Sequence, residues 1–412
     1  MNILYYNPDR GVPVLGDKGA SVHVRAMAEA LRDLGHRVVI VCATKGAGNR
    51  LEGVEIVECS RVTDDVAEAE TLSSLGLSRD SLADIVLARE VAKISGEIGR
   101  AAWLESQLAS LGFAPDLIYE RHALFHWAGG ELAGRLGVAR LLEVNAPLVD
   151  EQARYRGLRL RAQAEAAERR NYEGASAIIA VSDAVAAHVQ AIVGTAVPVK
   201  TVQNGVNLAL FQQADCHELR TRLGLEDKTV IGFVGSFKAW HGVMELVDAF
   251  ASLLRDDPCL HLVALGDGPE AGRVQSRIDE LAIGHACTLP GRAQHNEVAD
   301  WLALMDIVAA PYLTQPDFYF SPLKIIEAQA AGRAVVAPRL GQIGAMIDDN
   351  VTGSLYAPDD PSGLTSSLAR LVKQPLLRHQ LGRAARDGAA GQDWKHIAGR
   401  ILSYAAPRGV AP

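Results

Sequence analysis

Short apolar runs that are typical of β-strands alternate with helical patterns along this chain, and the alternation limits the folds open to it. In the first half the runs are NILYY, RVVIV, DLIYE, ARLLEV and SAIIAV, and a helical pattern over residues 21–34 separates the first two. Strands separated by helices are typical of parallel sheets covered by helices on both faces. The first half therefore predicts a doubly wound α/β domain.

The pattern breaks near residues 194–198 and then starts again. The runs VKTVQNG, TVIGFVG, LHLVALG, ACTLPG, DIVAAP and AVVAP follow, with helical stretches between them. A chain of 412 residues is long enough for two such domains. We expect two Rossmann-like α/β domains, residues 1–196 and 197–390, facing across a cleft that holds the ligand site, followed by a helical tail over 391–412.

The composition disfavours several classes of protein. Hydrophobic residues make up 49% of the chain and charged residues 22%, as in an ordinary soluble globular protein. A net charge of −8 disfavours nucleic acid as a partner, because binding a phosphate backbone needs a basic surface. Five scattered cysteines without a CxxC pair indicate reduced thiols and no zinc site. With no apolar leader and no membrane span in the sequence, we expect a cytoplasmic protein.

The segment FYFSPLKIIEAQAAG, residues 318–332, predicts a helix whose amino end faces an anion. Ser321 suits the N-cap, Pro322 the first helical position, and the final glycine a left-handed stop. Lys324 then lies in the first turn, where the helix dipole disfavours a cation unless an anion lies nearby. These features favour a phosphate site at the carboxyl edge of a sheet. The alternative is a surface lysine that pairs with Glu327 one turn later.

Taken together, the motifs resemble those of the retaining glycosyltransferases of GT-B architecture, most of all glycosyltransferase family 4. The similarity covers nearly the whole chain and includes GDKGAS with VHVRAMAEALRDLGHRVVIV, VQNGVN, GFVGSFKAWHG, LVALGDGPE, the GR at 291–292 and SPLKIIEAQAAGRAVVAP. The order and spacing make the match specific. It implies that the second domain grips a nucleotide sugar, that the first binds most of the acceptor, and that the terminal helix crosses back to the first domain.

The resemblance also implies a donor site. Glu327 would bind the ribose hydroxyls, the backbone of residues 321–323 the diphosphate, and the segment after Gly291 the base. The turn at Gly19 would bring backbone amides to the diphosphate or the sugar, unless it is a plain turn that needs small residues. The expected donor-binding residues are Gly19, Ala20, Ser236, His241, Gly266, Arg292, Tyr319, Phe320, Ser321, Pro322, Leu323 and Glu327.

The chain departs from the family pattern inside this donor site. Tyr319 stands where the family has a glutamate that touches the donor sugar. Ser236 and His241 stand where the family has an arginine and a lysine that hold the pyrophosphate. Lys238 and Lys324 are candidates to restore the two lost charges, because either ammonium group can face a diphosphate.

In the first domain, Asn145 takes the place of a family histidine that contacts the donor sugar. Asparagine can donate to or accept from a sugar hydroxyl, but it cannot titrate. The expected acceptor contacts are charged or polar residues at or near the ends of neighbouring strands: Glu120, Arg121, His122, Glu143 and Glu151. The alternative for Glu143 and Arg121 is a structural ion pair. The expected catalytic residues are Lys324, Lys238, Asn145 and Glu327.

The chemistry implied by the resemblance is transfer with retention, in which the leaving phosphate takes the proton of the acceptor and no protein nucleophile is needed. The sequence has no DxD in a fitting loop and no ligand-spaced His or Asp cluster, so we predict transfer without a metal. We expect no cofactor beyond the nucleotide-sugar co-substrate, with a UDP-sugar favoured and a GDP-sugar as the other option.

The acceptor is expected to be a small molecule or a saccharide. Residues 154–170 hold six arginines and two glutamates and could touch an anionic membrane, but the apolar stripe is mostly alanine, so a solvated helix face is favoured over peripheral membrane contact. The alternative functions are a sugar-nucleotide epimerase or hydrolase on the same fold and a non-catalytic nucleotide-sugar-binding partner. The oligomeric state is left open.

Overall fold

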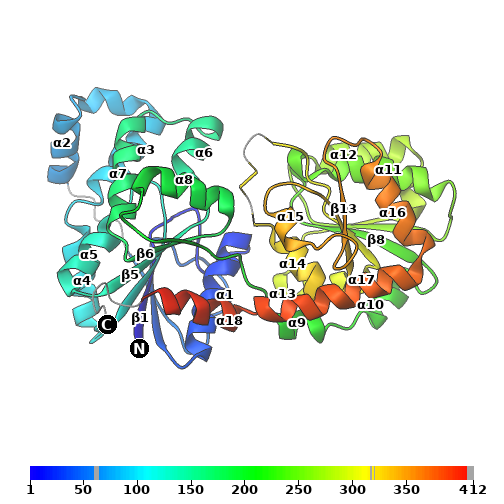
Figure 1. The fold of residues 1–412 in the computed structure, drawn as a ribbon. Helices are drawn as coiled ribbons and strands as arrows, with labels where there is room; N and C mark the ends of the chain where they lie inside the picture. The colour runs from blue at the N-terminus through cyan, green and yellow to red at the C-terminus, as the bar shows by residue number, and fades with distance from the viewer. Residues whose placement is uncertain (60–64, 316–317, 320, 406–412) are drawn as a thin grey trace. The chain divides into compact units, whose positions relative to one another are not determined.

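The computed structural model describes residues 1–59, 65–315, 318–319 and 321–405. These residues form two compact units. The first joins Met1–Gln203 with the chain from Lys395 onward, and the second is Asn204–Trp394. Each unit has its own parallel sheet with helices packed around it (Figure 1). The predicted class of two Rossmann-like α/β domains is confirmed.

Within its described residues the first unit has a seven-stranded parallel sheet in the order β3-β2-β1-β4-β5-β6-β7. The chain runs outward from β1 in one direction and then returns to β4 on the other side, so the strand order reverses between β1 and β4. The strands are β1 (Asn2–Asn7), β2 (Arg37–Cys42), β3 (Glu55–Glu58), β4 (Leu117–Arg121), β5 (Ala139–Val144), β6 (Ala177–Ala180) and β7 (Val199–Thr201).

The helices of the first unit cover this sheet because each buries one apolar face. Helix α1, for example, buries Val24, Met27, Ala28 and Leu31, which recur at helical spacing. The helices are α1 (Gly19–Asp33), α2 (Asp65–Ser74), α3 (Ile85–Ser95), α4 (Arg100–Ser110), α5 (Ala128–Leu136), α6 (Leu148–Tyr155), α7 (Arg161–Glu173) and α8 (Asp183–Val193), with the short turn η1 (Arg79–Ala83). From Lys395 on, α18 (Trp394–Leu402) and η5 (Ser403–Ala405) also belong to this unit.

The described part of the second unit has a six-stranded parallel sheet in the order β10-β9-β8-β11-β12-β13. Here the strand order reverses between β8 and β11, which are paired neighbours. In sheets of this kind, ligands bind outside the carboxyl ends of the strands at such a switch point. The strands are β8 (Thr229–Val234), β9 (Leu260–Leu265), β10 (Cys287–Gly291), β11 (Ile307–Ala309), β12 (Ala334–Pro338) and β13 (Ser354–Tyr356).

The helices of the second unit enclose two apolar clusters, one on each face of the sheet. Strand β9 is buried along its whole length and β8 along all but its first residue, as expected for strands covered on both faces. The helices are α9 (Leu208–Gln212), α10 (His217–Leu223), α11 (Val243–Leu254), α12 (Ala271–Glu280), α13 (His295–Leu304), α14 (Leu323–Ala330), α15 (Ile343–Met346), α16 (Gly363–Lys373) and α17 (Pro375–Gly388), with the turns η2 (Ala239–His241), η3 (Gly284–Ala286) and η4 (Ala389–Gln392).

The run VKTVQNG does not open the second domain as we expected. Its first residues form β7, which pairs with β6 through Ile178 and Val199 and completes the first sheet. The first unit therefore extends to Gln203, and the second begins with Asn204. The second unit's own sheet starts with β8, so the apolar run alone could not tell which sheet it would join.

The helix predicted from FYFSPLKIIEAQAAG is present, but it begins later than we expected. Pro322 is the N-cap of α14, without a side-chain capping bond. Ser321 lies outside the helix, where its carbonyl accepts a hydrogen bond of 3.3 Å from the side-chain amide of Asn204. Gly332 has a φ of +70°, so the left-handed stop after the helix is confirmed.

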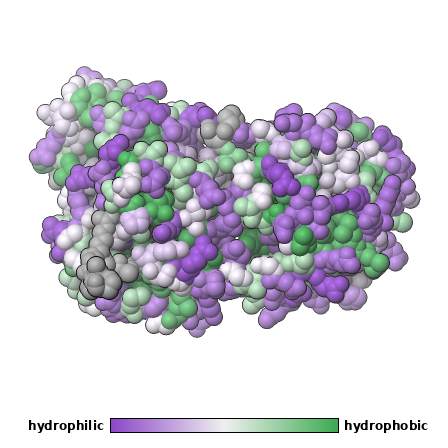
Figure 2. Space-filling view, viewed as in Figure 1, coloured by the Kyte–Doolittle hydropathy of each residue, from purple (hydrophilic) through white to green (hydrophobic). Residues whose placement is uncertain are grey.

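On the visible face of the molecule, hydrophilic residues are mixed with small apolar patches (Figure 2). None of the helices in the described part of the chain combines the length and the apolarity needed to cross a bilayer.

Candidate active site

Two glycines bring together the loops that leave β8 and β9 at the carboxyl edge of the second sheet. A Cβ atom on Gly266 would lie 1.8 Å from the carbonyl oxygen of Gly235, and Gly266 itself has a φ of +142°. The amide of Gly235 donates to Leu265 at 2.9 Å, and the amide of Phe237 donates to Asp267 at 3.0 Å. Only glycine fits this approach, so the loops after the two strands form one packed layer.

A third loop joins this layer from β11. A Cβ atom on Gly242 would lie 1.8 Å from the carbonyl oxygen of Pro311. The amide of Leu313 donates to the carbonyl oxygen of Trp240 at 3.0 Å. The loop after β8 is therefore held on both sides at the switch point of the sheet, where ligand sites of this fold class lie.

Lys324, in the first turn of α14, reaches into this layer. Its side chain is 8% exposed, and Nζ has no hydrogen-bond partner among the described residues. Nζ lies 4.1 Å from the ring centroid of Phe233 and 4.9 Å from that of Tyr312. A Cβ atom on Gly235 would come within 2.9 Å of Nζ. The ammonium group is thus held by two aromatic faces beside a backbone that leaves it room.

No carboxylate in the described part of the chain lies within ion-pair distance of Lys324. Glu327, one turn further along α14, is half-buried and interacts with Lys324 only at longer range. Burial lowers the pKa of Lys324 and raises the pKa of Glu327, and the charge of each partly opposes the shift of the other. The alternative of an exposed Lys324–Glu327 surface pair is therefore wrong. A buried cation without a partner is costly, which makes this amine a candidate anion site.

His241 lies beside Lys324 and is held in one tautomer. Its Nδ1 lies 2.5 Å from the carbonyl oxygen of Ser236, and a carbonyl can only accept, so Nδ1 carries the proton and donates. The ring packs edge-on against Tyr312, with the ring centroids 5.2 Å apart. Burial and the charge of Lys324 lower the pKa of His241 to about 3, so the ring is neutral near pH 7.

The other expected donor residues lie at this edge with different exposure. Lys238 is exposed, with Nζ 4.8 Å from the ring centroid of Trp240, and it does not share the buried position of Lys324. Arg292 is exposed and pairs with Asp267 at 3.4 Å. Tyr319 is half-buried. Pro322 is buried and Leu323 half-buried at the start of α14, and Phe320 lies outside the described residues.

In the first unit, Glu143 at the end of β5 is the centre of a buried polar cluster. Its carboxylate accepts from Tyr119, from His23 at 2.8 Å, from Arg121 at 2.8 Å and from Asn145 at 2.5 Å. Burial would raise the pKa of Glu143, but these partners hold it well below its usual range. The structural ion pair that we gave as the alternative for Glu143 and Arg121 is thus present.

The same cluster changes the expected role of Asn145. Its amide nitrogen donates one of its two N–H groups to the carboxylate of Glu143, which leaves one N–H and the carbonyl oxygen of that side chain for a ligand. Glu143 itself is 1% exposed. We expected the side chains of Asn145 and Glu143 to be available to a ligand, but in the structure they are hydrogen-bonded to each other.

Glu120 and His122 point into the unit, contrary to the expectation that they line an acceptor site. Glu120 has no exposed surface and pairs with the equally buried Arg140 at 2.6 Å. Arg140 also donates to the side-chain oxygen of Asn171, whose amide nitrogen lies 3.0 Å from Nδ1 of His122. On its other side, His122 Nε2 faces Glu168 at 3.5 Å. These strand-end residues form an internal polar network.

The remaining expected residues of the first unit lie at its surface. Gly19 is exposed and Ala20 half-buried at the start of α1, which begins at Gly19 and not at Ser21. Glu151 on α6 pairs with Arg156 at 2.9 Å. The start of α1 and the side chain of Glu151 are both at least partly accessible to solvent.

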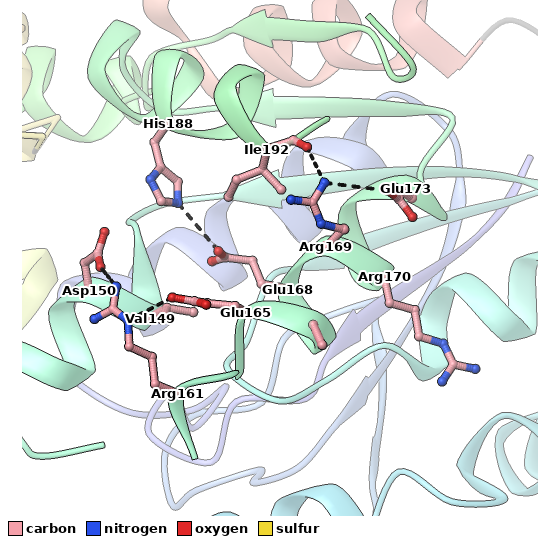
Figure 3. A pocket seen from close by; sticks show the side chains of 11 residues that line it. Val149, Asp150, Arg161, Glu165, Glu168, Arg169, Arg170, Glu173, His188 and Ile192 are labelled. Carbon is pink, nitrogen blue, oxygen red and sulfur yellow. Dashed lines mark hydrogen bonds and ion pairs between the residues drawn. The ribbon is translucent and has the colours of Figure 1, made fainter. Parts of the chain in front are cut away.

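A cavity of about 540 Å³ lies between α6, α7 and α8 of the first unit (Figure 3). Arg161 stands between Asp150 and Glu165, at 2.6 and 2.8 Å, and Arg169 donates to the carbonyl oxygen of Ile192 at 2.7 Å. The arginines of this helix are thus occupied by acceptors of the same unit. Residues 156–160 separate α6 from α7, so the solvated helix face that we favoured over a membrane contact is divided between two helices.

The aromatic rings that hold Lys324 were not predicted from the sequence. Phe233 lies in β8 and Tyr312 in the loop just after β11, and these two strands flank the switch point. Their only signal in the sequence is an aromatic residue near the end of an apolar run, which a buried core residue shows equally well.

Two sequence profiles match the chain. The profile described as "Glycosyl transferase 4-like domain" covers residues 18–205, and the one described as "Glycosyl transferases group 1" covers residues 228–374. A relative from Catenulispora acidiphila, named D-inositol 3-phosphate glycosyltransferase 1, is 29% identical over 68% of this chain and 70% of its own. Other relatives named D-inositol 3-phosphate glycosyltransferase match over about half of their own length.

Solved structures share the fold over nearly all of the chain. Sucrose-phosphate synthase from Thermosynechococcus elongatus has a TM-score of 0.70 at 20% identity and covers 98% of both chains. The Anabaena protein HepE in complex with UDP-glucose has a TM-score of 0.67 at 18% identity, again over 98% of both chains. The chain is therefore a glycosyltransferase of the GT-B class, similar to family 4.

Proposed function

We propose that this glycosyltransferase moves a sugar from a nucleotide sugar, with UDP-sugars favoured over GDP-sugars, to a small-molecule or saccharide acceptor. The observation that carries the proposal is the buried amine of Lys324, which has no partner among the described residues and lies at the switch point of the second sheet. A diphosphate would supply the missing counter-charge. The complex of the structurally similar HepE protein with UDP-glucose supports UDP as the first nucleotide to test.

The chemistry needs stabilisation of negative charge on the leaving diphosphate. Lys324 acts there from a site with little water, where a charge interacts more strongly than at the surface. Glu327, one turn along α14, is the proposed ribose contact, and Lys238 in the loop after β8 is the proposed second cation. We propose that both act together with Lys324 on the donor.

Retention of the anomeric configuration and transfer without a metal belong to the same proposal. The family resemblance supports retention. Transfer without a metal is proposed from the sequence, which has no DxD in a fitting loop. Unpaired cysteines among the described residues support a reducing compartment such as the cytoplasm.

The acceptor class is proposed from the relatives. Several are named D-inositol 3-phosphate glycosyltransferases, so a phosphorylated cyclitol is the first acceptor to test. Arg121, Glu143 and Glu151 remain the proposed acceptor contacts, and Asn145 remains the proposed contact to the donor sugar. Asn145, Arg121 and Glu143 form one hydrogen-bonded cluster.

Product analysis tests the proposal. The protein is incubated with UDP-glucose and GDP-glucose, each with inositol phosphate or a saccharide panel, and products are identified by mass spectrometry and by NMR of the new anomeric centre, with and without EDTA. We expect a glycoside with retained configuration from the UDP-sugar, unaffected by EDTA. Release of free sugar with every acceptor would indicate a hydrolase, and an unchanged donor would indicate a binding protein.

A matched pair of variants tests whether formation of the product depends on Lys324. Lys324→Met removes the buried amine, and Lys373→Met removes an exposed lysine at the end of α16. Only the first should abolish transfer. Equal activity in both variants would contradict the proposed role of Lys324.

A further inference from the structure

The loop after β8 holds a histidine at a position where the family pattern has a cation. His241 ends the turn η2, and its backbone amide donates to Lys238 at 2.9 Å while its Nδ1 donates to the carbonyl oxygen of Ser236. The side chain and the backbone therefore close the same turn. This leaves the ring with one fixed orientation.

The fixed Nδ1 proton determines what the other ring nitrogen can do. In a neutral imidazole with the proton on Nδ1, Nε2 carries a lone pair and can only accept. Nε2 has no hydrogen-bond partner among the described residues, and the side chain is half-buried. The ring thus presents an acceptor and no charge.

The surroundings keep the ring neutral. The charged groups that face it are Lys324 from α14 and Lys238 from its own loop, and both oppose protonation. The other groups around it are the Phe233 and Tyr312 rings, with centroids 6.4 and 5.2 Å away, and Trp240 beside it at 6.0 Å. No carboxylate among the described residues acts on the ring. The hydrogen bond to the carbonyl oxygen of Ser236 favours the protonated form, but burial and the two lysines outweigh it.

A neutral acceptor cannot serve a diphosphate. Ionised phosphate oxygens are acceptors as well, and two acceptors facing each other repel. The groups of a nucleotide sugar that can donate to Nε2 are the hydroxyls of its two sugars and the N–H groups of its base, and the hydroxyls lie nearer to the phosphates. Lys324 offers the charge for the phosphates, and His241 beside it offers the partner for a hydroxyl.

We propose that Nε2 of His241 accepts a hydrogen bond from a hydroxyl of the transferred sugar, so that His241 determines which sugars the donor site takes. This inference rests on the proposed nucleotide-sugar function and deepens it. It assigns to the loop after β8 a role in selecting the sugar. In the family pattern, the residue at this position binds pyrophosphate.

The test compares UDP with UDP-glucose by isothermal titration on the full chain. His241→Asn keeps an amide nitrogen close to the position of Nδ1 and can still donate to Ser236, but it lacks an acceptor at the distance of Nε2. We expect this variant to bind UDP as the wild type does and to lose about tenfold in affinity for UDP-glucose, the loss of one hydrogen bond. Monodeoxy UDP-glucose analogues then identify the hydroxyl: one analogue should bind tenfold more weakly to the wild type and no more weakly than UDP-glucose to the variant.

A second histidine of the same unit is the control. His261 in β9 is also buried, and its Nε2 lies 2.8 Å from the hydroxyl oxygen of Thr288. It lies near the amino end of its strand, away from the switch-point loops. His261→Asn should leave both affinities unchanged.

The outcomes separate this inference from the function on which it rests. If the wild type bound neither UDP nor UDP-glucose, the proposed donor would fail and His241 with it. If the wild type bound both and His241→Asn lost equal affinity for both, the histidine would only shape the loop, and the sugar contact would be overturned. No loss for either ligand would overturn it as well.

Discussion

The amine of Lys324 lies 4.1 Å from the ring centroid of Phe233 and has neither a hydrogen bond nor an ion pair in the described part of the chain. An aromatic face attracts a cation, but it does not replace the lost hydration of a buried ammonium group. The unliganded site is therefore less stable than it could be. The proposed affinity for an anionic ligand and the cost in stability have the same origin in this residue.

Replacement of Lys324 should separate stability from binding. Lys324→Met fills the same space without a charge, so we expect the free energy of unfolding to rise by about 1 kcal/mol. The affinity for UDP should fall about 10- to 100-fold, because a charge-assisted hydrogen bond is lost. Thermal melts and calorimetric titration measure the two effects, with Lys373→Met as the exposed control. Loss of stability together with unchanged affinity would contradict this view.

The affinity for UDP should depend on pH above neutrality. Burial lowers the pKa of Lys324 to about 7 and raises the pKa of Glu327 to about 7. As the pH rises above about 7, Lys324 loses its charge and Glu327 gains one, and both changes disfavour an anion. We expect the affinity for UDP to decrease from about pH 7 to 9. For each proton that binding takes up, the affinity should fall by at most tenfold per pH unit.

Proton uptake is measured directly by titration with UDP in buffers that differ in ionisation enthalpy. The uptake at pH 8 should be larger in the wild type than in Lys324→Met, by close to one proton. Equal heats in all buffers for the wild type would show that the amine is already charged before UDP binds.

Glu143 should be one of the main stabilising side chains of the first unit. Glu143→Gln keeps the shape but removes the charge that faces His23 and Arg121, so we expect a loss of about 3 kcal/mol in the free energy of unfolding. Urea denaturation measures it. Glu165→Gln is the control, because Glu165 is exposed and its partner Arg161 still pairs with Asp150 in the variant. This change should have little effect.

The same carboxylate predicts a direction for acid denaturation. The folded state holds the pKa of Glu143 below its unfolded value, so its stabilisation is complete above about pH 4.5 and decreases as the pH falls below that value. Denaturation curves between about pH 5 and 3 should show a steeper loss for the wild type than for Glu143→Gln. Parallel losses in both proteins would show that Glu143 does not titrate differently on unfolding.

The ion pair of Glu120 and Arg140 should be strongly coupled. Both side chains are completely buried, 2.6 Å apart, so Arg140→Met leaves an uncompensated carboxylate and should cost about 3–5 kcal/mol. The double variant Glu120→Gln with Arg140→Met should recover part of that loss. The exposed pair of Arg135 and Glu105 is the control and should show little coupling. Additive effects at the buried pair would contradict a direct interaction.

The element pattern was predictable because it depends on neighbouring residues. The runs NILYY and TVIGFVG became β1 and β8, and the helix after SPLK became α14. The first residues of VKTVQNG were assigned to the wrong sheet because a short apolar run carries no information about which edge it will pair with. Which sheet a strand joins depends on residues far away in the sequence.

The candidate site was predictable only in part. Lys324 and Glu327 could be found from their place at the start of a helix after a strand. Glu120 and His122 occupied similar positions at strand ends, yet Arg140, Asn171 and Glu168 bind them inside the unit. A residue at the end of a strand lies at the functional edge of a sheet. Whether its side chain can contact a ligand depends on the partners that the side chain has inside the unit.

The sequence by itself determined the two α/β units and the family, and it predicted the carboxyl edge of the second sheet as a place for an anion. These depend on periodicity, capping and motif order, which are local. Only the tertiary structure decided that Lys324 is buried between Phe233 and Tyr312 and that the Nδ1 proton of His241 is fixed by the carbonyl oxygen of Ser236. Charge and tautomer depend on burial and on hydrogen-bond partners, and those exist only once the loops after β8, β9 and β11 have packed together.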